Sequence, residues 1–140
     1  MTIALWMLLA FAGWTVLTLL AGVGAVRWTL ILSGHRRLNE FPADVPHGSA
    51  RYRRAVRAHA NCVENLPVYG AVAVTAALAG VHGGALDTLP PIYMTARVAQ
   101  TITHVACAET SRAVGVRFAF FLVQLVCVIA MGIAVARGAG

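Results

Sequence analysis

The sequence has no lysine, few acidic residues and little charge of either sign. Only 11% of its 140 residues are charged, whereas soluble domains carry about a quarter. Hydrophobic residues make up 59% of the chain, and the mean hydropathy is +0.76. These values exclude a small soluble domain and indicate that lipid surrounds most of the protein surface.

The net charge of +6 comes from 11 arginines against five acidic residues. In membrane proteins, basic residues accumulate in the cytoplasmic loops. The charge therefore predicts orientation in a membrane, and it does not indicate nucleic-acid binding.

Cysteine and histidine provide no recognisable metal-binding pattern. The three cysteines, Cys62, Cys107 and Cys127, have no C-x-x-C spacing and lie in apolar stretches, so we expect them to be packing residues. His59 and His104 lack the cysteine or carboxylate partners that a zinc site needs. No metal cofactor is predicted.

The apolar stretches predict four transmembrane helices in a single all-α domain of residues 1–140. Crossing about 30 Å of hydrocarbon takes roughly 20 apolar residues, so four helices use most of the chain. The first stretch has no charged segment before it and is too long for the core of a secretory signal, so we expect it to be retained. The predicted helices cover about residues 3–32, 50–81, 85–110 and 113–136.

The arginines divide unequally among the connections between these helices. The second connection has none, while the first and third hold Arg36, Arg37, Arg51, Arg53, Arg54, Arg112 and Arg117. The basic connections are therefore expected on the cytoplasmic side, with both termini outside. For Arg36 and Arg37, position alone favours anchoring at the membrane surface.

Four polar residues in the second helix need an explanation, because ionisable groups inside a membrane cost at least a few kcal/mol. At ~100° per residue, Arg57, Asn61, Glu64 and Asn65 fall within an arc of about 100° and share one helix face. His59 points elsewhere. These polar residues predict a functional face on the second helix.

The third helix has a similar polar face, formed by Arg97, Gln100 and His104. Two such faces favour one shared, water-accessible ligand cavity at the cytoplasmic end. The alternative is that Arg57 and Arg97 each form an ion pair with Glu64 and lock the bundle without binding a ligand.

The segment that opens the second helix contains the pattern R-A-H-x-N-x-x-E-N, at residues 57–65, followed by Pro67. This pattern resembles the signature of the MAPEG family, the membrane-associated proteins of eicosanoid and glutathione metabolism. It is closest to microsomal glutathione transferases, in a bacterial type of member. The similarity extends across the chain and includes Arg36-Arg37, Phe41-Pro42, Ala96-Arg97 and Ser111-Arg112-Ala113.

The resemblance implies a left-handed four-helix bundle that forms a homotrimer in a membrane, here the bacterial inner membrane. Glutathione would be the co-substrate, bound between subunits near the cytoplasmic face. Arg112 is similar to the arginine that enzymatic members place near the glutathione sulfur, and His104 stands where several of them have tyrosine. The glutathione-binding positions implied in this way are Arg37, Arg57, Asn61, Glu64, Asn65, Arg97 and His104.

The expected activity is that of a glutathione transferase or peroxidase acting on lipophilic electrophiles or lipid hydroperoxides that enter from the bilayer. An arginine beside a thiol favours the reactive thiolate, which is the role expected for Arg112. The alternative is a non-catalytic lipid-binding or scaffold protein of the same fold. A transporter is disfavoured, because four short helices contain no discontinuous pair.

Overall fold

The computed structural model describes residues 1–41 and 47–138, and its regular elements there are all helical. Pro42 of the expected Phe-Pro pair lies outside the described residues. Four helical rods follow one another, which confirms the predicted all-α four-helix fold. Their elements are α1 (Ile3–Leu17), η1 (Thr18–Gly24), α2 (Ala25–Leu32), a short 3-10 turn η2 (Leu38–Glu40), α3 (Ala50–Leu78), α4 (Ala85–Ala106) and α5 (Ser111–Gly138).

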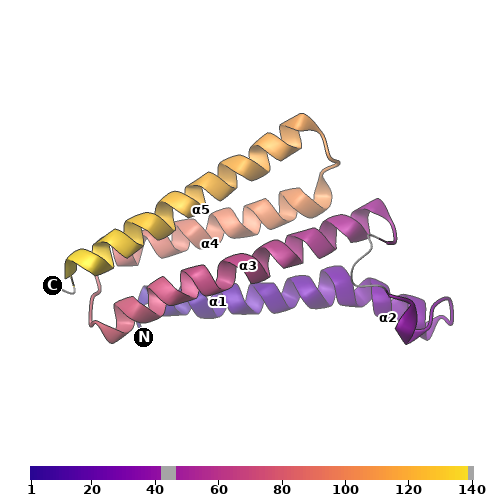
Figure 1. The fold of residues 1–140 in the computed structure, drawn as a ribbon, viewed down its shortest axis with the longest axis horizontal. Helices are drawn as coiled ribbons and strands as arrows, with labels where there is room; N and C mark the ends of the chain where they lie inside the picture. Colours follow the sequence, from indigo (N-terminus) through magenta and orange to yellow (C-terminus); the bar gives the residue numbers. More distant parts are fainter. Residues whose placement is uncertain (42–46, 139–140) are drawn as a thin grey trace.

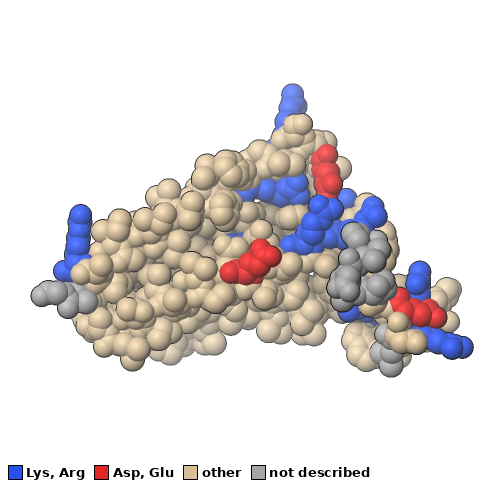
Figure 2. All heavy atoms as spheres, in the orientation of Figure 1, with Lys and Arg blue, Asp and Glu red and all other residues tan. Residues whose placement is uncertain are grey.

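The rods lie side by side and alternate in direction (Figure 1). The α2–α3 and α4–α5 connections are at one end of the bundle, and both termini and the α3–α4 connection are at the other. Most arginines gather at the first of these ends, which we call the basic end (Figure 2). The alternation agrees with the topology expected from the arginine distribution.

Four of the predicted helix boundaries were wrong by two to four residues, including the end of α5, which lies at Gly138 instead of residue 136. At the other three, turn and capping residues set the boundary before the apolar pattern stops. The third rod, α4, ends at Ala106 instead of residue 110, and α5 begins at Ser111 instead of residue 113. The Thr110 hydroxyl accepts a hydrogen bond from the Ala113 N–H at 3.2 Å, as a helix N-cap does. Helix α3 ends at Leu78 instead of residue 81, and Gly80 follows with a φ of 68° that favours glycine.

The first rod contains a π-helical segment that the sequence did not predict. This segment, η1, interrupts the α-helix between Thr18 and Gly24. A Cβ at Gly24 would lie 3.2 Å from the Leu19 carbonyl oxygen, and one at Gly22 would lie 3.3 Å from the Cβ of Ala55 in α3. Glycine therefore permits both the wider turn and the close approach of η1 to α3.

An aromatic cluster joins α1, α3 and α4. Phe11 of α1 packs against Tyr69 of α3 and Tyr93 of α4, with ring centroids 6.2 and 5.8 Å away. The Tyr69 hydroxyl donates a hydrogen bond to the Ala4 carbonyl at 3.1 Å. Met131 of α5 is fully buried in the same core. This cluster fixes the helix packing next to the candidate site.

Much of the outer surface is apolar, with side chains such as Leu32 and Leu78 more than 80% exposed. Within the described chain, the segments Ile3–Leu32 and Ser111–Gly138 are long and apolar enough to cross a membrane. The composition of α3 and α4 alone does not identify them as spans, and α3 opens with four arginines.

Candidate functional site

Arg97 connects the two polar faces that the sequence predicts. This α4 side chain is only 1% exposed. Its Nη1 donates hydrogen bonds to Asn61 Oδ1 on α3, at 2.5 Å, and to Gln100 Oε1 one turn along α4, at 2.9 Å. The faces of α3 and α4 therefore meet directly, as their periodicity predicts.

The guanidinium of Arg97 is surrounded mainly by neutral groups, which replace part of its solvation by water. Its Nε and Nη2 have no hydrogen-bond partner in residues 1–41 and 47–138, and its guanidinium carbon lies 5.4 Å from the centroid of the Phe11 ring. A buried charge costs several kcal/mol unless its surroundings offset the lost solvation, and amide oxygens and a ring face offset it only in part. The position of Arg97 thus depends on keeping its few partners in place.

Gln124 extends this network into α5, and sequence reasoning missed it. Its Nε2 donates to Gln100 Oε1 at 3.2 Å and to the Phe120 carbonyl at 2.9 Å. In turn, Gln100 Nε2 donates to the Arg117 carbonyl at 3.0 Å. The signal that could have revealed Gln124 is a single amide within an otherwise apolar span, because buried polar groups in membranes require partners.

Thr101 connects the first rod to the same hydrogen-bond network. Its hydroxyl donates to the Arg97 carbonyl at 2.9 Å and accepts from Trp14 Nε1 at 3.3 Å, and the Cys62 sulfur lies 3.6 Å away. All four rods are thereby linked by polar side chains. We call the central set the polar layer; its members are Asn61, Arg97, Gln100, Thr101 and Gln124.

The signature face of α3 passes through this polar layer, with Arg57 on the side of the basic end and Glu64 and Asn65 on the other side. Asn65 Nδ2 donates to the Asn61 carbonyl at 2.8 Å and contacts Asn61 Oδ1 at 3.4 Å. Glu64 and Arg57 are exposed. His59 lies 3.1 Å from the Thr18 hydroxyl and so faces the first rod, as expected from its angle.

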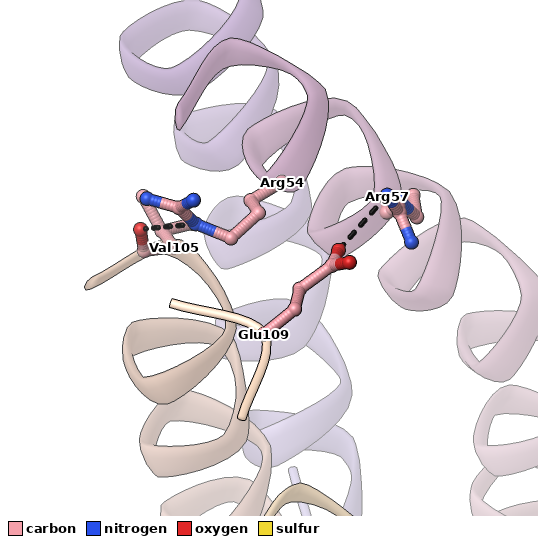
Figure 3. Close-up of polar contacts among 4 residues, drawn as sticks. All are labelled: Arg54, Arg57, Val105 and Glu109. Atoms are coloured by element: carbon pink, nitrogen blue, oxygen red, sulfur yellow. Dashed lines mark hydrogen bonds and ion pairs between the residues drawn. The ribbon is translucent and has the colours of Figure 1, made fainter. Parts of the chain in front are cut away.

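At the basic end, Arg57 pairs with Glu109 of the α4–α5 connection, with Nη2 and Oε1 2.9 Å apart (Figure 3). Arg54 Nε donates to the Val105 carbonyl at 3.2 Å and so caps the end of α4. His104, in the last turn of α4, is half-buried and lies within electrostatic reach of both arginines.

The two ion pairs through Glu64 that the alternative interpretation requires are absent from the described part of the chain. Arg57 pairs with Glu109 instead, and Arg97 binds the neutral amides of Asn61 and Gln100. The Arg57 pair is exposed, at 59% and 48% for the two side chains. An exposed pair contributes at most about 1 kcal/mol, so a ligand can displace it at little cost.

A model of the MAPEG family matches residues 3–137, nearly the whole chain. The chain belongs to the MAPEG family. No curated protein matches the sequence. The family is one of membrane helical bundles, and its members include glutathione transferases and peroxidases as well as other proteins.

Two of the residues carried over from the MAPEG resemblance lie apart from the polar layer. Arg112 is exposed in the first turn of α5. Arg37 is exposed at the start of η2, where its N–H donates to the Glu40 carboxylate at 3.2 Å. Within a single chain, neither side chain has a described contact with Asn61 or Arg97.

The cysteines differ from the expectation in one respect. Cys62 and Cys127 are buried, as predicted, but Cys107 is exposed. The cause is the early end of α4, which leaves Cys107 in extended conformation just beyond the helix. The described residues contain no group of three histidine, cysteine or acidic side chains that could hold a metal ion.

An apolar groove of about 410 Å³ opens between the first rod, α3 and α4. Trp14, Leu17, Ile102 and Arg51 contribute to its walls, and Thr101 connects it to the polar layer. Such a groove fits an apolar chain rather than a charged peptide.

Proposed function

We propose that this MAPEG protein is a glutathione-dependent membrane transferase or peroxidase acting on lipophilic electrophiles or lipid hydroperoxides. The observation that carries the proposal is the direct contact between the signature and the buried cation. Asn61 is bound by Arg97 and Asn65, and it lies between Arg57 and Glu64 on the same α3 face. A rigid amide group thus adjoins an exposed acid and an exposed guanidinium.

These groups fit the chemistry of glutathione, which carries two carboxylates and one ammonium. Guanidinium groups bind carboxylates through paired hydrogen bonds, and Arg57 is held only by its exposed pair with Glu109. Glu64 is exposed and has no ion pair in the described residues, so its carboxylate is available to an ammonium. Asn61, between these charges, and Asn65, next to Glu64, supply neutral hydrogen-bonding groups.

The proposed assembly is a homotrimer in which glutathione lies between neighbouring subunits. In one chain, Arg57, Glu64 and Val63 are exposed along the same part of α3, so a second subunit can cover a ligand bound there. The proposed orientation places the basic end at the cytoplasmic face and both termini outside, in a bacterial inner membrane. The site then faces the compartment on the basic side.

In the proposed chemistry, Arg112 stabilises the glutathione thiolate by its positive charge. With an electrophile, the sulfur forms a bond to carbon and the leaving group departs with the electrons of its bond. With a hydroperoxide, the sulfur bonds to the terminal oxygen, the O–O bond breaks and the alkoxide takes a proton to leave as an alcohol. A second glutathione then displaces water from the sulfenic acid and forms the disulfide.

The experiment measures glutathione-dependent turnover of a chromogenic electrophile and of a lipid hydroperoxide by the purified full chain in detergent. Arg112→Ala is expected to lower kcat on the order of 100-fold, because removing one group that stabilises developing charge has effects of that size. Arg137→Ala is the matched control, since Arg137 is an exposed arginine at the other end of α5. Turnover at the uncatalysed rate, unchanged by Arg112→Ala, would contradict the proposal.

A second candidate function is the binding of an apolar lipid without chemistry, favoured by the groove beside Trp14 and Ile102. It predicts that a fluorescent fatty acid raises the unfolding temperature while glutathione leaves it unchanged. The same two titrations therefore separate the two functions.

A further inference from the structure

The side chain of Gln124 is buried on α5, away from the signature, yet it ends an unbroken chain of hydrogen bonds to Asn61. Gln124 is 1% exposed. Its Nε2 donates to Gln100 Oε1, and the same oxygen accepts from Arg97 Nη1, which also donates to Asn61 Oδ1. The chain contains only two glutamines, and they are bonded to each other.

The donor character of arginine determines how Asn61 is turned. A guanidinium has only N–H donors, so the oxygen of the Asn61 amide must face Arg97. Asn65 Nδ2 adds a second donor to that oxygen, at 3.4 Å. Asn61 Nδ2 is then directed away from Arg97, and it has no hydrogen-bond partner among the described residues. Asn61 is half-buried, so this nitrogen can offer its N–H groups to a ligand oxygen.

The same logic applies to Gln100, whose oxygen must also face Arg97. The terminal torsion of a glutamine is broad and roughly two-fold, so Gln100 needs further contacts to keep its oxygen on that side. Gln124 Nε2 supplies one by donating to this oxygen, and the Arg117 carbonyl supplies the other by accepting from Gln100 Nε2. Without Gln124, one of the two contacts that fix the amide is lost.

Besides its two hydrogen bonds, Arg97 lies against the Phe11 ring and within electrostatic reach of Tyr93. Its Nε and Nη2 are unpartnered within the described chain, and the Phe11 ring restrains only the face of the guanidinium. A change in Gln100 therefore reaches Asn61 through Arg97, because these hydrogen bonds share a single nitrogen, Nη1.

We propose that Gln124 is a positioning residue that acts through Gln100 and Arg97 to hold the Asn61 amide with its N–H donors toward the ligand. The identity of that ligand as glutathione rests on the proposed function. The orientation of Asn61 does not, because it follows from hydrogen bonds within the chain.

The test replaces Gln124 by methionine, which has a similar unbranched shape but no amide. Met131→Ala is the matched control, because Met131 is a fully buried α5 residue of the aromatic core outside the polar layer. Selective ¹⁵N-asparagine labelling gives only three side-chain amides, from Asn39, Asn61 and Asn65. Their NMR signals in detergent-solubilised protein report the Asn61 orientation without any ligand.

In Gln124→Met, the Asn61 side-chain signal is expected to shift or broaden while that of Asn39 does not move. In Met131→Ala, all three signals are expected to stay in place. An unmoved Asn61 signal in folded Gln124→Met would overturn the proposal, whether or not glutathione binds. Gln124→Leu provides the same comparison if Gln124→Met does not fold.

Calorimetric titration with glutathione tests the consequence for binding. Gln124→Met is expected to weaken binding about tenfold, within the range of couplings measured for residues in one network. In an Asn61→Ala background, the same change is expected to have no further effect. Equal losses in both backgrounds would overturn the positioning role. Failure of the unmodified protein to bind glutathione would instead overturn the proposed function, and the NMR result would then decide the positioning role alone.

Discussion

Arg57 Nη2 lies 2.9 Å from Glu109 Oε1, so the first residue of the signature pattern ties α3 to the α4–α5 connection (Figure 3). Both partners are about half exposed. The pair closes the basic end of the bundle at low energetic cost, and it competes with any anion that approaches Arg57. This competition connects the fold to ligand affinity.

Glu109→Gln is expected to strengthen glutathione binding several-fold, because Arg57 no longer has a carboxylate to exchange for that of the ligand. The free energy of unfolding should change by less than about 1 kcal/mol. Calorimetric titration and thermal unfolding measure the two effects. Glu40→Gln is the control, since Glu40 is an exposed acid whose described contact is with the backbone of Arg37. Unchanged or weaker binding in Glu109→Gln would show that Arg57 does not bind the ligand.

The polar layer is expected to respond to mutation as one unit. Gln100→Leu removes an acceptor from Arg97 and a partner from Gln124, and should destabilise the protein by about 1–3 kcal/mol. Arg97→Met is expected to offset part of this loss in the double variant, because the buried charge has then been removed. Thermal unfolding of the single and double variants measures the coupling. Strictly additive losses would mean that Arg97 and Gln100 contribute independently.

Much of the fold follows from the sequence, because apolar length and arginine distribution are properties of whole segments. The meeting of α3 and α4 at Asn61 and Arg97 was also predictable, since polar residues at helical spacing share a face. The partner of Arg57 was not. Glu64 lies on the same face, but seven residues along an α-helix span about 10.5 Å. Glu109, from another part of the chain, is closer.

Two further features could not be predicted from the sequence: the contact of Gln124 with Gln100, and the end of α4 at Ala106. A single glutamine has no periodicity, so only packing reveals that it faces Gln100. The apolar pattern continues past Ala106, but the Thr110 hydroxyl caps α5 and competes with further growth of α4. Such local competition cannot be judged from hydrophobicity.

Two glycines of the first rod are expected to respond oppositely to the same substitution. Gly24→Ala places a Cβ 3.2 Å from the Leu19 carbonyl and should lower the unfolding temperature by disturbing the π-helical turn. Gly13→Ala meets nothing within 4 Å and should stabilise the helix by roughly 0.5–1 kcal/mol. Thermal unfolding in detergent compares them. A more stable Gly24→Ala would indicate that η1 can become α-helical without strain.

Cys107 offers a test of orientation, because it is the one exposed cysteine of the three and lies beside the α4–α5 connection at the basic end. A membrane-impermeant maleimide is expected to label Cys107 in inside-out vesicles, where the cytoplasmic face is accessible, and not in right-side-out vesicles. The buried Cys62 and Cys127 should react only after unfolding. The control is Arg137→Cys in a Cys107→Ala background, which places the thiol near the C-terminus and should reverse the pattern. Labelling of Cys107 only from the outside would place the basic end there and overturn the proposed topology, while leaving the hydrogen bonds of the polar layer unaffected.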